Sequence, residues 1–425
     1  MNNLELLAPA GNFLKMKTAF TYGADAVYLG IPDFSLRVRI NDFDLQGIKE
    51  AVKYAHDRQK KVYVTVNIFA HNQHLSKLPA YIKVLKALKV DALIISDPGI
   101  LALVKKYWPK AEIHLSTQAN CTNLAAVKFW QKQGVKRIIL GREVTLKEIK
   151  EIHQAAPQVD LEYFVHGAMC MTYSGRCFLS KLLVDRSANL GDCAQPCRWE
   201  YDVLLRSANH PEELEIVEER HGAYLLNSKD LCLLKYLKEL AAAGVTSFKI
   251  EGRAKSVYYQ AVVCGIYRQA LELITKKTPA TKLNQELDFL EKELKTKLVH
   301  RGYTTGFLLG DKADQNIFDS HNVSSWEFCG QVINLEERQG KKLRIYFQVH
   351  NTLKIGDKVE IIKPNYDIIK IKLENLWEAK TEQALTKAHG GGGGTIAYLE
   401  YDFDAIPNGL GTLPVLSVLR RLNQR

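Results

Sequence analysis

The chain has 425 residues, of which 46% are hydrophobic and 25% are charged, as in folded proteins with two or three domains. No apolar run approaches the length needed to cross a bilayer, which argues against a membrane-spanning protein. The formal net charge of +11 favours a polyanionic partner such as RNA, although lysines on the polar faces of helices would give the same excess without any partner.

The N-terminal stretch MNNLELLAPAG lacks the basic and long apolar regions of a signal peptide. We therefore expect a cytoplasmic protein whose thiols stay reduced, so structural disulfides are not expected. Clustered cysteines in such a protein are more often metal ligands or redox groups than disulfide cross-links.

Short apolar segments alternate with amphipathic helical segments from the N-terminus to about Ser256. Helices are expected between the strands, for example over 45–59 and 146–155. This alternation predicts a parallel sheet covered by helices, and eight strands favour an α/β fold of the (β/α)₈ TIM-like barrel type, complete or distorted. No GxGxxG follows the first strand, which weakens the open dinucleotide-binding alternative. The expected strands are 4–8, 26–30, 61–67, 91–96, 112–117, 137–141, 161–166 and 247–251.

Polar residues stand at or just past the carboxyl ends of these strands. In (β/α)₈ barrels this rim carries the chemistry. Some of these residues will instead be structural, and Asp97, which precedes Pro98, is expected to cap a helix. The set consists of Asn67, Asp97, Gln118, Arg142, Glu143, His166, Glu251 and Arg253.

A long insertion, about 167–246, separates the seventh and eighth strands and leaves the barrel at the same rim. Long irregular loops in compact domains are usually functional or stabilised by an additional element. The insertion ends in a segment where Asn227, Ser228 or Asp230 is expected to cap a helix that carries Cys232 near its first turn. This helix would bring Cys232 toward the other cysteines of the insertion, which are Cys170, Cys177, Cys193 and Cys197.

The cysteine spacings are not the CxxC pairs of a structural zinc site, and Glu200 excludes a Cx3Cx2C motif that would begin at Cys193. Four thiolates from an irregular loop with few histidines nearby favour a 4Fe–4S cluster, and buried, inert cysteines are the alternative. Spacing alone does not decide which four would bind, because Cys197 competes with Cys193. The cysteines on apolar stretches, Cys121, Cys264 and Cys329, are expected to be core residues.

The composition changes towards the C-terminus. We expect a barrel with its insertion over 1–275, a helical and charged connector over 276–328, and a small β-barrel domain over 329–425. The last assignment follows from short strands joined by turns, of which KIGDKVEII is the strongest signal. The glycine run 390–394 is expected to be a loop rather than a phosphate-binding loop, since no GK[ST] follows it.

Several of these stretches together resemble the peptidase U32 family, also called collagenase-like peptidases. They cover nearly the whole predicted barrel, and the C-terminal domain is similar to the β-barrel that longer members append. The tail DAIPNGLGTLPVLSVLRR is less typical of the family. The matching stretches are LELLAPAGN, GADAVYLG, HLSTQ, EYFVHGAMCMTYSGRCFLS, GDCAQPCRWEY, NSKDLC and FKIEGR.

Members of this family include hydroxylases of tRNA, a ribosomal-RNA cytidine hydroxylase, and paired proteins that hydroxylate ubiquinone precursors without oxygen. The likeness to the tRNA-modifying members implies formation of 5-hydroxyuridine at the wobble position of tRNA, with prephenate required and a 4Fe–4S cluster bound. Likeness to a ubiquinone-pathway member implies that the cluster ligands are Cys170, Cys177, Cys193 and Cys232. Cys197 is then an additional cysteine of open role.

Prephenate carries two carboxylates, for which guanidinium groups are the natural partners. Arg142 and Arg253 are the first candidates, each with an ion pair to Glu143 or Glu251 as the structural alternative. His166 could shuttle a proton, or it could simply bond a backbone carbonyl. The remaining candidates are Glu251 as a catalytic group, Arg37 and Arg39 as second-choice carboxylate partners, and Asn67 and Gln118 as substrate-binding residues.

Two other classes of function stay open. A peptidase needs a nucleophile with a base or a metal-bound water, and the chain has no HExxH or GxSxG motif. Cys170 beside His166 would be the one Cys–His pair, inside the predicted cluster segment. A non-catalytic RNA-binding or assembly partner is the second alternative. Under any of these functions, we expect the protein to work either as a homo-oligomer or with a paired family member.

Overall fold

The computed structural model describes residues 4–36, 41–170, 172–173, 176–199, 201, 204–207, 210–215, 227–310, 314–316, 321–322, 324–339, 341–391, 394–402 and 406–423. The chain forms two compact units. The first comprises Met1–Met16, Asp25–Ala254 and Val299–Asn322, and the second comprises Lys17–Ala24, Lys255–Leu298 and Val323–Arg425. Within the part of the chain that is described, no helix has both the length and the apolar character required to span a membrane.

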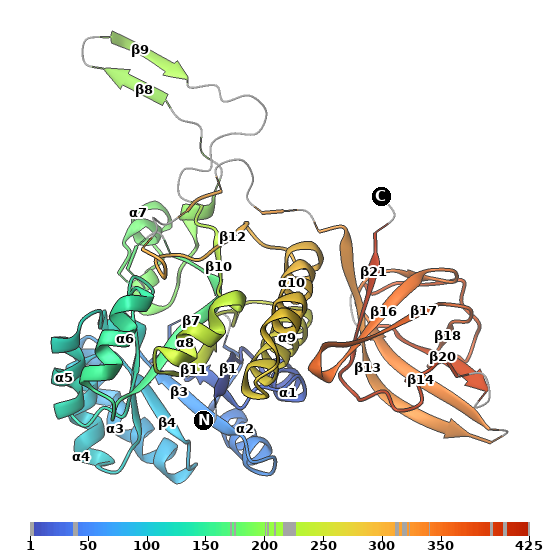
Figure 1. The fold of residues 1–425 in the computed structure, drawn as a ribbon, viewed down its shortest axis with the longest axis horizontal. Helices are drawn as coiled ribbons and strands as arrows, with labels where there is room; N and C mark the ends of the chain where they lie inside the picture. Colours follow the sequence, from blue (N-terminus) through green and yellow to red (C-terminus); the bar gives the residue numbers. More distant parts are fainter. Residues whose placement is uncertain are drawn as a thin grey trace. The chain divides into compact units, whose positions relative to one another are not determined.

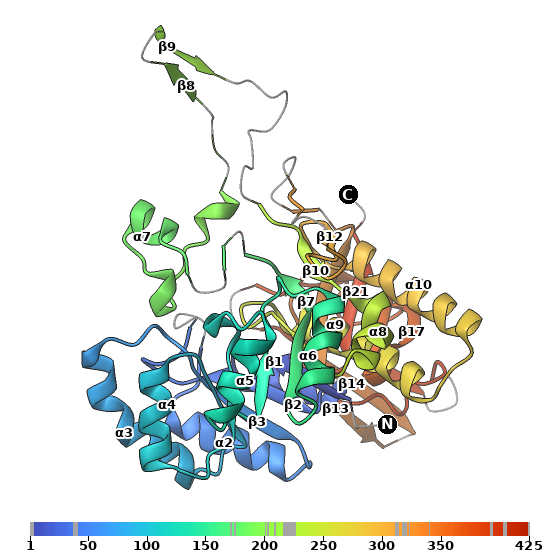
Figure 2. The same cartoon turned by 60° about the vertical axis from the view of Figure 1, so that its left-hand side comes forward.

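The first unit is a closed barrel of parallel strands, as the alternation of apolar and amphipathic segments predicted. The strands pair in chain order, and β11 closes the barrel because it pairs with both β7 and β1. Figures 1 and 2 show helices outside the ring of strands. The barrel strands are β1 (Glu5–Pro9), β2 (Ala26–Gly30), β3 (Lys61–Val66), β4 (Ala92–Ile95), β5 (Ile113–Leu115), β6 (Arg137–Ile139), β7 (Asp160–Ala168) and β11 (Val245–Ile250).

The strands and helices form for the reasons that the sequence suggests. All five residues of β2 are buried, which suits a strand with a packed core on one face and helices on the other. In α2, a buried stripe with helical spacing faces inward and Asp44 caps the N-terminus. Asp97 caps α4 through the backbone N–H of Ile100 at 3.0 Å, as predicted. The helices between the strands are α1 (Phe13–Thr21), α2 (Leu45–His56), α3 (Asn72–Ala87), α4 (Pro98–Tyr107), α5 (Leu124–Lys132), α6 (Leu146–Ala155) and α8 (Leu237–Ala242).

Four charged side chains inside the barrel pair with one another. Arg137 of β6 contacts Glu5 of β1 and, at 3.4 Å, Glu162 of β7. Lys249 of β11 donates to Glu162 at 2.7 Å. Burial alone would raise the pKa of Glu5, but the charge of Arg137 holds it below its usual range. The network therefore keeps its charges compensated and joins the strands on both sides of the closure.

The insertion leaves the barrel from the carboxyl end of β7, as predicted, but the segment around Cys232 differs from the prediction. Cys232 lies on a strand, β10 (Asp230–Cys232), and not on a helix. The backbone of β10 pairs antiparallel with residues 166–168 of β7. Asp230 caps no helix because its carboxylate forms a buried ion pair with Arg301. The other elements are α7 (Leu179–Val184), the turns η3 (Ala188–Leu190), η4 (Pro196–Arg198) and η5 (Leu234–Tyr236), the hairpin of β8 (Leu204–Ser207) and β9 (His210–Glu215), and β12 (Tyr303–Thr304).

The second unit combines two helices with an antiparallel sheet. The sheet has the order β17-β16-β21-β13-β14-β20-β18, so β17 and β18 are its edges among the described residues. One face covers an apolar core that includes Cys329 and Phe347. The helices are α9 (Val257–Thr275) and α10 (Ala280–Lys297), and the strands are β13 (Trp326–Arg338), β14 (Lys342–Val349), β15 (Leu353–Lys354), β16 (Lys358–Lys363), β17 (Asp367–Lys372), β18 (Trp377–Glu378), β19 (Lys387–Ala388), β20 (Ile396–Asp402) and β21 (Val418–Leu422), with the turn η6 (Pro364–Tyr366).

The helices α9 and α10 belong to this second unit, whereas the sequence placed 255–275 with the barrel and 276–328 in a connector. The reason lies in their side chains. Tyr258 of α9 donates to the backbone carbonyl of Lys297 at 2.9 Å, and its ring stacks on Phe328 of β13. Helical periodicity predicts that such a helix forms but not which sheet it packs against.

Arg420 of β21 is the centre of a buried ion-pair network in this unit. Its side chain is fully buried and contacts Glu293 of α10 and Glu360 of β16, and it also donates to the Tyr366 hydroxyl at 2.9 Å. Burial favours the neutral form of Glu293, but Arg420 and Lys297 together lower its pKa. The network thereby fixes α10 against the sheet.

We expect Arg420→Ala to destabilise the second unit by about 3–5 kcal/mol, because it leaves the buried carboxylates of Glu293 and Glu360 with only Lys297 to compensate them. Urea unfolding followed by tryptophan fluorescence measures this, since Trp326 lies 5.3 Å from the Arg420 guanidinium. The control is Arg338→Ala, which removes an exposed pair with Glu336 and should leave the midpoint nearly unchanged. Equal midpoints for both variants would contradict a structural role of the network.

Candidate functional site

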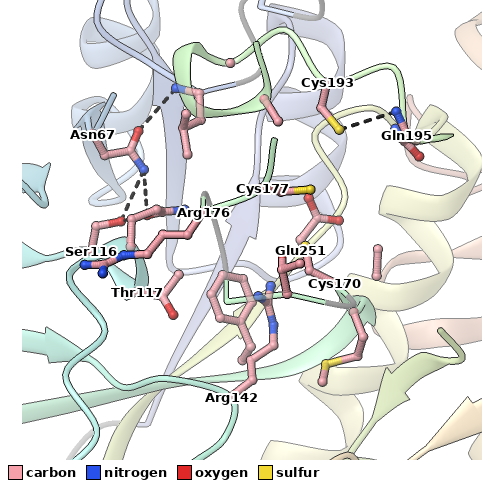
Figure 3. A pocket seen from close by; sticks show the side chains of 18 of the residues that line it. Asn67, Ser116, Thr117, Arg142, Cys170, Arg176, Cys177, Cys193, Gln195 and Glu251 are labelled. Atoms are coloured by element: carbon pink, nitrogen blue, oxygen red, sulfur yellow. Dashed lines mark hydrogen bonds between the residues drawn. The ribbon is translucent and has the colours of Figure 1, made fainter. Parts of the chain in front are cut away.

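A cavity of about 510 Å³ opens at the carboxyl ends of the barrel strands. Its deeper wall is apolar, from residues such as Ile94, Ile139 and Phe164 on β4, β6 and β7. Its outer wall comes from the insertion, which contributes cysteines and the side chains of α7 (Figure 3). The cavity therefore lies where the sequence placed the chemistry of a (β/α)₈ barrel.

Asn67 and Gln118 form part of the rim, and they bond to each other. The Asn67 amide nitrogen donates to the Gln118 side-chain oxygen at 3.0 Å and to the Ser116 hydroxyl at 3.2 Å. The Asn67 oxygen accepts from the backbone N–H of Leu36 at 3.3 Å (Figure 3). These bonds fix the loops after β3 and β5, so both residues shape the cavity as well as line it.

The charged residues of the wall are mostly basic. Five basic side chains face one acidic side chain, which favours an anionic ligand. Arg142 is 8% exposed, and its guanidinium lies 3.8 Å from the centre of the Phe164 ring. The Tyr163 hydroxyl lies 3.1 Å from the Arg142 carbonyl oxygen and holds this loop. The basic residues are Arg142, Arg176, Arg198, Lys249 and Arg253, and the acidic residue is Glu251.

Arg253 lies on another part of the wall, in the loop after β11. It is 7% exposed and donates to the Ser35 hydroxyl at 3.1 Å. Its backbone carbonyl accepts from the Lys15 ammonium at 3.2 Å. The two arginines predicted to bind carboxylates therefore line one cavity from separate loops. The other two predicted arginines, Arg37 and Arg39, lie outside the described residues.

Four of the insertion cysteines, Cys170, Cys177, Cys193 and Cys197, line the same cavity. The loops that carry them are held by local bonds: the backbone N–H of Cys177 donates to Asn189 at 3.0 Å, and that of Gln195 donates to the Cys193 sulfur at 3.3 Å. In Figure 3, the side chains of Cys177 and Cys193 lie in the upper part of the cavity, with Arg142 at its lower end.

Cys232 and His166 lie together just outside this lining. They face each other in the register of β10 and β7, and His166 is almost fully buried. The His166 carbonyl accepts from the backbone N–H of Glu251 at 2.8 Å. This close approach requires Gly167, which has a φ of +111°, because a Cβ at this position would lie only 2.4 Å from the Glu251 carbonyl oxygen.

The donor chemistry of the insertion fits a thiolate-bound metal group. None of the eight cysteines forms a disulfide, and those of the insertion are partly or fully accessible. The backbone bond to the Cys193 sulfur is of the kind that surrounds metal-bound thiolates. Within the described ranges, no three His, Cys, Asp or Glu side chains are gathered closely enough to hold a metal ion. The thiols are thus the right kind of ligand for such a metal group, but the described side chains are not arranged as a complete set of ligands.

The remaining cysteines are core residues, as predicted. Cys121, Cys264 and Cys329 are buried. Burial raises the pKa of each of these three thiols to about 12. They are therefore neutral and shielded near neutral pH.

The sequence reasoning missed the charged residues inside the barrel, above all Lys249 and its partner Glu162. A signal was present, since each stands in an otherwise apolar strand segment, FKI and LEYF. A charged residue in a strand buried on both faces must have a partner inside the barrel. Arg176 and Arg198, in the insertion, were also missed, and no periodic pattern marks them.

Comparison with known proteins agrees with this architecture. The sequence pattern of peptidase family U32 matches residues 11–317, and that of the peptidase family U32 C-terminal domain matches residues 324–409. The tRNA hydroxylation protein P of Haemophilus influenzae is 40% identical over 425 residues, covering 89% of each chain. The chain therefore belongs to peptidase family U32.

Two further relatives have other names. The 23S rRNA 5-hydroxycytidine C2501 synthase of Escherichia coli is 38% identical over 323 residues, which are 75% of this chain and 47% of that protein. A protein of Porphyromonas gingivalis named collagenase is 29% identical over 402 residues, covering 91% of this chain and 93% of that protein. The family thus joins proteins named for RNA hydroxylation with proteins named for proteolysis.

We expect the thiols to divide by burial in an alkylation experiment. Iodoacetamide applied at pH 8 to the metal-free native protein should modify Cys170 first, because its side chain is exposed, and should leave Cys121, Cys264 and Cys329 unmodified. Peptide mass spectrometry measures each site, with the urea-unfolded protein as the control in which all eight react. Modification of Cys264 as fast as Cys170 would contradict the described packing.

Proposed function

We propose that this protein is a tRNA-modifying hydroxylase that forms 5-hydroxyuridine at the wobble position, with prephenate and a 4Fe–4S cluster. The observation that carries the proposal is one cavity at the barrel mouth whose wall combines basic side chains with free cysteines. The likeness to tRNA hydroxylation protein P over 89% of the chain supports the same reaction class. A tRNA substrate places the proposed activity in the cytoplasm.

Arg142 and Arg253 are the proposed partners of the two prephenate carboxylates. A guanidinium forms paired, charge-assisted hydrogen bonds with a carboxylate, and these gain strength where water is excluded. Both arginines are more than nine-tenths buried and line the cavity from different loops. Two carboxylates held at separate points would fix the orientation of the ligand.

The proposed cluster ligands are Cys170, Cys177, Cys193 and Cys232. When bound, a 4Fe–4S cluster supplies one-electron redox chemistry, which neither the arginines nor the Glu251 carboxylate of the cavity can supply. The antiparallel pairing of β10 with β7 fixes the backbone of Cys232 beside the cavity, whereas the other three cysteines come from the irregular part of the insertion. Cys197 lines the cavity as an additional thiol.

The nucleotide must reach the cavity with its base unstacked. Anticodon bases are single-stranded, so their extrusion costs less than that of a paired base. The basic excess that would attract the tRNA backbone lies mainly before residue 324, because the segment 324–425 has 14 Lys and Arg against 12 Asp and Glu. Both compact units nevertheless carry a net positive charge, so both can attract the tRNA backbone.

Replacement of the C5 hydrogen of uridine by a hydroxyl group is a two-electron oxidation that needs an oxygen donor and an electron acceptor, and the C5 proton must also be removed. Glu251 is the only carboxylate in the described lining of the cavity, and it is our proposed acceptor of that proton. His166 is on the neighbouring strand, where its backbone carbonyl accepts from the Glu251 N–H at 2.8 Å, and we propose its imidazole as the group that passes the proton onward. Both roles are proposals that follow from position.

Proteolysis is the main alternative, because the Porphyromonas gingivalis relative is named collagenase. The Cys–His pair predicted for a peptidase consists of Cys170 and His166. Cys170 is exposed and lines the cavity, whereas His166 is buried and does not line it. A nucleophile and its base must share access to the substrate. The positions of these two residues therefore favour hydroxylation.

Nucleoside mass spectrometry of a strain that lacks the gene tests the reaction. We expect 5-hydroxyuridine to disappear from tRNA and to return with the intact gene or with Cys264→Ala, but not with Cys170→Ala, Cys177→Ala or Cys232→Ala. Iron analysis of the purified variants should show the same division, because four thiolates are needed per cluster. Unchanged tRNA together with loss of 5-hydroxycytidine from ribosomal RNA would contradict the proposed substrate.

Replacing Arg142 or Arg253 by Lys tests prephenate binding. Lysine keeps the charge but loses the paired geometry, so each variant should bind prephenate about tenfold to a hundredfold more weakly, corresponding to roughly 1.5–3 kcal/mol. Calorimetry measures the affinity. Arg58→Lys is the matched control, since Arg58 packs on Tyr54 of α2 away from the cavity. Wild-type affinity in both cavity variants would refute this assignment.

A further inference from the structure

We propose that Lys249 is a catalytic residue that condenses with the ketone carbon of a 2-oxo acid bound in the cavity, forming an imine. The inference deepens the proposed function, because prephenate is itself a 2-oxo acid. It assigns a covalent role to a side chain inside the barrel, separate from the cysteines and from the two arginines that would hold carboxylates.

Lys249 has the position that such a reaction requires. It lines the cavity although its side chain is only 3% exposed. Its ammonium lies close to two aromatic rings, 4.4 Å from the centre of Tyr28 and 5.3 Å from that of Phe164. The Arg253 guanidinium lies 5.6 Å from the centre of the Tyr28 ring, and the Arg142 guanidinium lies 3.8 Å from the centre of the Phe164 ring.

The amine therefore shares the Tyr28 ring with the Arg253 guanidinium and the Phe164 ring with the Arg142 guanidinium. A ligand with a carboxylate on either arginine would therefore present its neighbouring carbons to the cavity wall that holds Lys249. In a 2-oxo acid, the ketone carbon is bonded directly to a carboxylate carbon. A carboxylate anchored by one arginine thus brings its ketone toward the amine.

Glu162 gives the lysine a proton acceptor. The Glu162 side chain is fully buried, and one of its oxygens lies 2.7 Å from the Lys249 nitrogen. Its other oxygen accepts from the Ser247 hydroxyl at 3.3 Å and contacts Arg137 at 3.4 Å. These contacts fix the carboxylate, so it can receive a proton from the amine and return it without rearrangement.

The surroundings also favour an amine that reacts. A lysine attacks a carbonyl only as the neutral amine, and desolvation beside other cations is the usual means of obtaining that form. Burial lowers the pKa of Lys249, and Arg253 and Arg137 act in the same direction, whereas Glu162 opposes them. The site thus combines a desolvated amine with an adjacent base.

The condensation balances without any further reagent. The ammonium of Lys249 transfers a proton to Glu162, and the neutral nitrogen attacks the ketone carbon. A C–N bond forms, and the former carbonyl oxygen takes up the proton from Glu162. A proton then moves from the nitrogen to this oxygen, the C–O bond breaks, and water leaves. The product is a protonated imine paired with the Glu162 carboxylate. The net change is ketone plus ammonium to iminium plus water.

Reductive trapping tests the proposal on the full-length protein. The protein is incubated with prephenate or, separately, with pyruvate in the presence of cyanoborohydride, which reduces iminium groups selectively. Peptide mass spectrometry then locates any adduct. We expect the reduced adduct on Lys249, and we expect none at that position in Lys249→Arg, which keeps the charge and the pairing with Glu162 but forms no imine.

Lys60→Arg is the matched control, because Lys60 is a partly buried lysine of the barrel unit that pairs with Asp25 and does not line the cavity. This variant should form the adduct on Lys249 as the wild type does. Absence of an adduct on Lys249 with both acids, although calorimetry shows that prephenate binds, would overturn the proposal. Full tRNA hydroxylation by Lys249→Arg would also overturn it.

The adduct measurement does not depend on which RNA the protein modifies. An adduct on Lys249 in the wild-type protein supports the imine even if nucleoside analysis shows that tRNA is not the substrate. A normal tRNA product without an adduct would refute the imine and leave the hydroxylase proposal standing. The wild-type measurement also does not depend on whether the arginine variant folds.

Discussion

The compensated charges inside the barrel are the constraint on which the site depends. Charges buried in a barrel interior require partners, and here Glu5, Arg137, Glu162 and Lys249 supply them to one another across β1, β6, β7 and β11. Because β11 closes the barrel onto β1 and β7, the network stands at the closure. It also holds Lys249 with its amine at the cavity wall.

The cavity above this network is positive and faces the cysteine-bearing insertion. The interior charges cancel, so the excess of the wall comes from Arg142, Arg253 and the two insertion arginines, opposed by Glu251. An anionic ligand held there would lie between the barrel strands and the thiols. This is the physical reason for treating the cysteines and the basic wall as one site, which unites the proposed roles of prephenate and the cluster.

Much of this organisation could be predicted from the sequence, because the signals are local. Apolar strand segments gave the barrel, the rim residues followed from the strand ends, and Asp97 caps its helix as expected. The helix predicted to carry Cys232 was wrong, because this residue lies on a strand that forms through pairing with β7, more than sixty residues earlier in the chain, which no local pattern encodes. The same limit applies to α9, whose periodicity predicts a helix but not its partner.

Lys249, inside the barrel, shows a second limit of prediction from the sequence. Lys249 stands in a motif that the sequence comparison used, yet only the folded barrel shows that it meets Glu162 from β7 and two aromatic rings. Its surroundings come from strands β2, β7 and β11, which are far apart in the chain. Single charged residues in separate apolar strands indicate that each has an ion-pair partner. The closure of the barrel determines which residue that partner is.

The central claim is that the thiols and the basic wall form one functional site. Electron paramagnetic resonance of the anaerobically purified, reduced protein, with and without prephenate, tests it most directly. We expect an iron–sulfur signal from about four iron per chain that changes when prephenate is added, and a much weaker change at the same concentration in Arg142→Lys. A protein without an iron–sulfur signal, or a signal that prephenate leaves unchanged while calorimetry shows it bound, would contradict a single functional site.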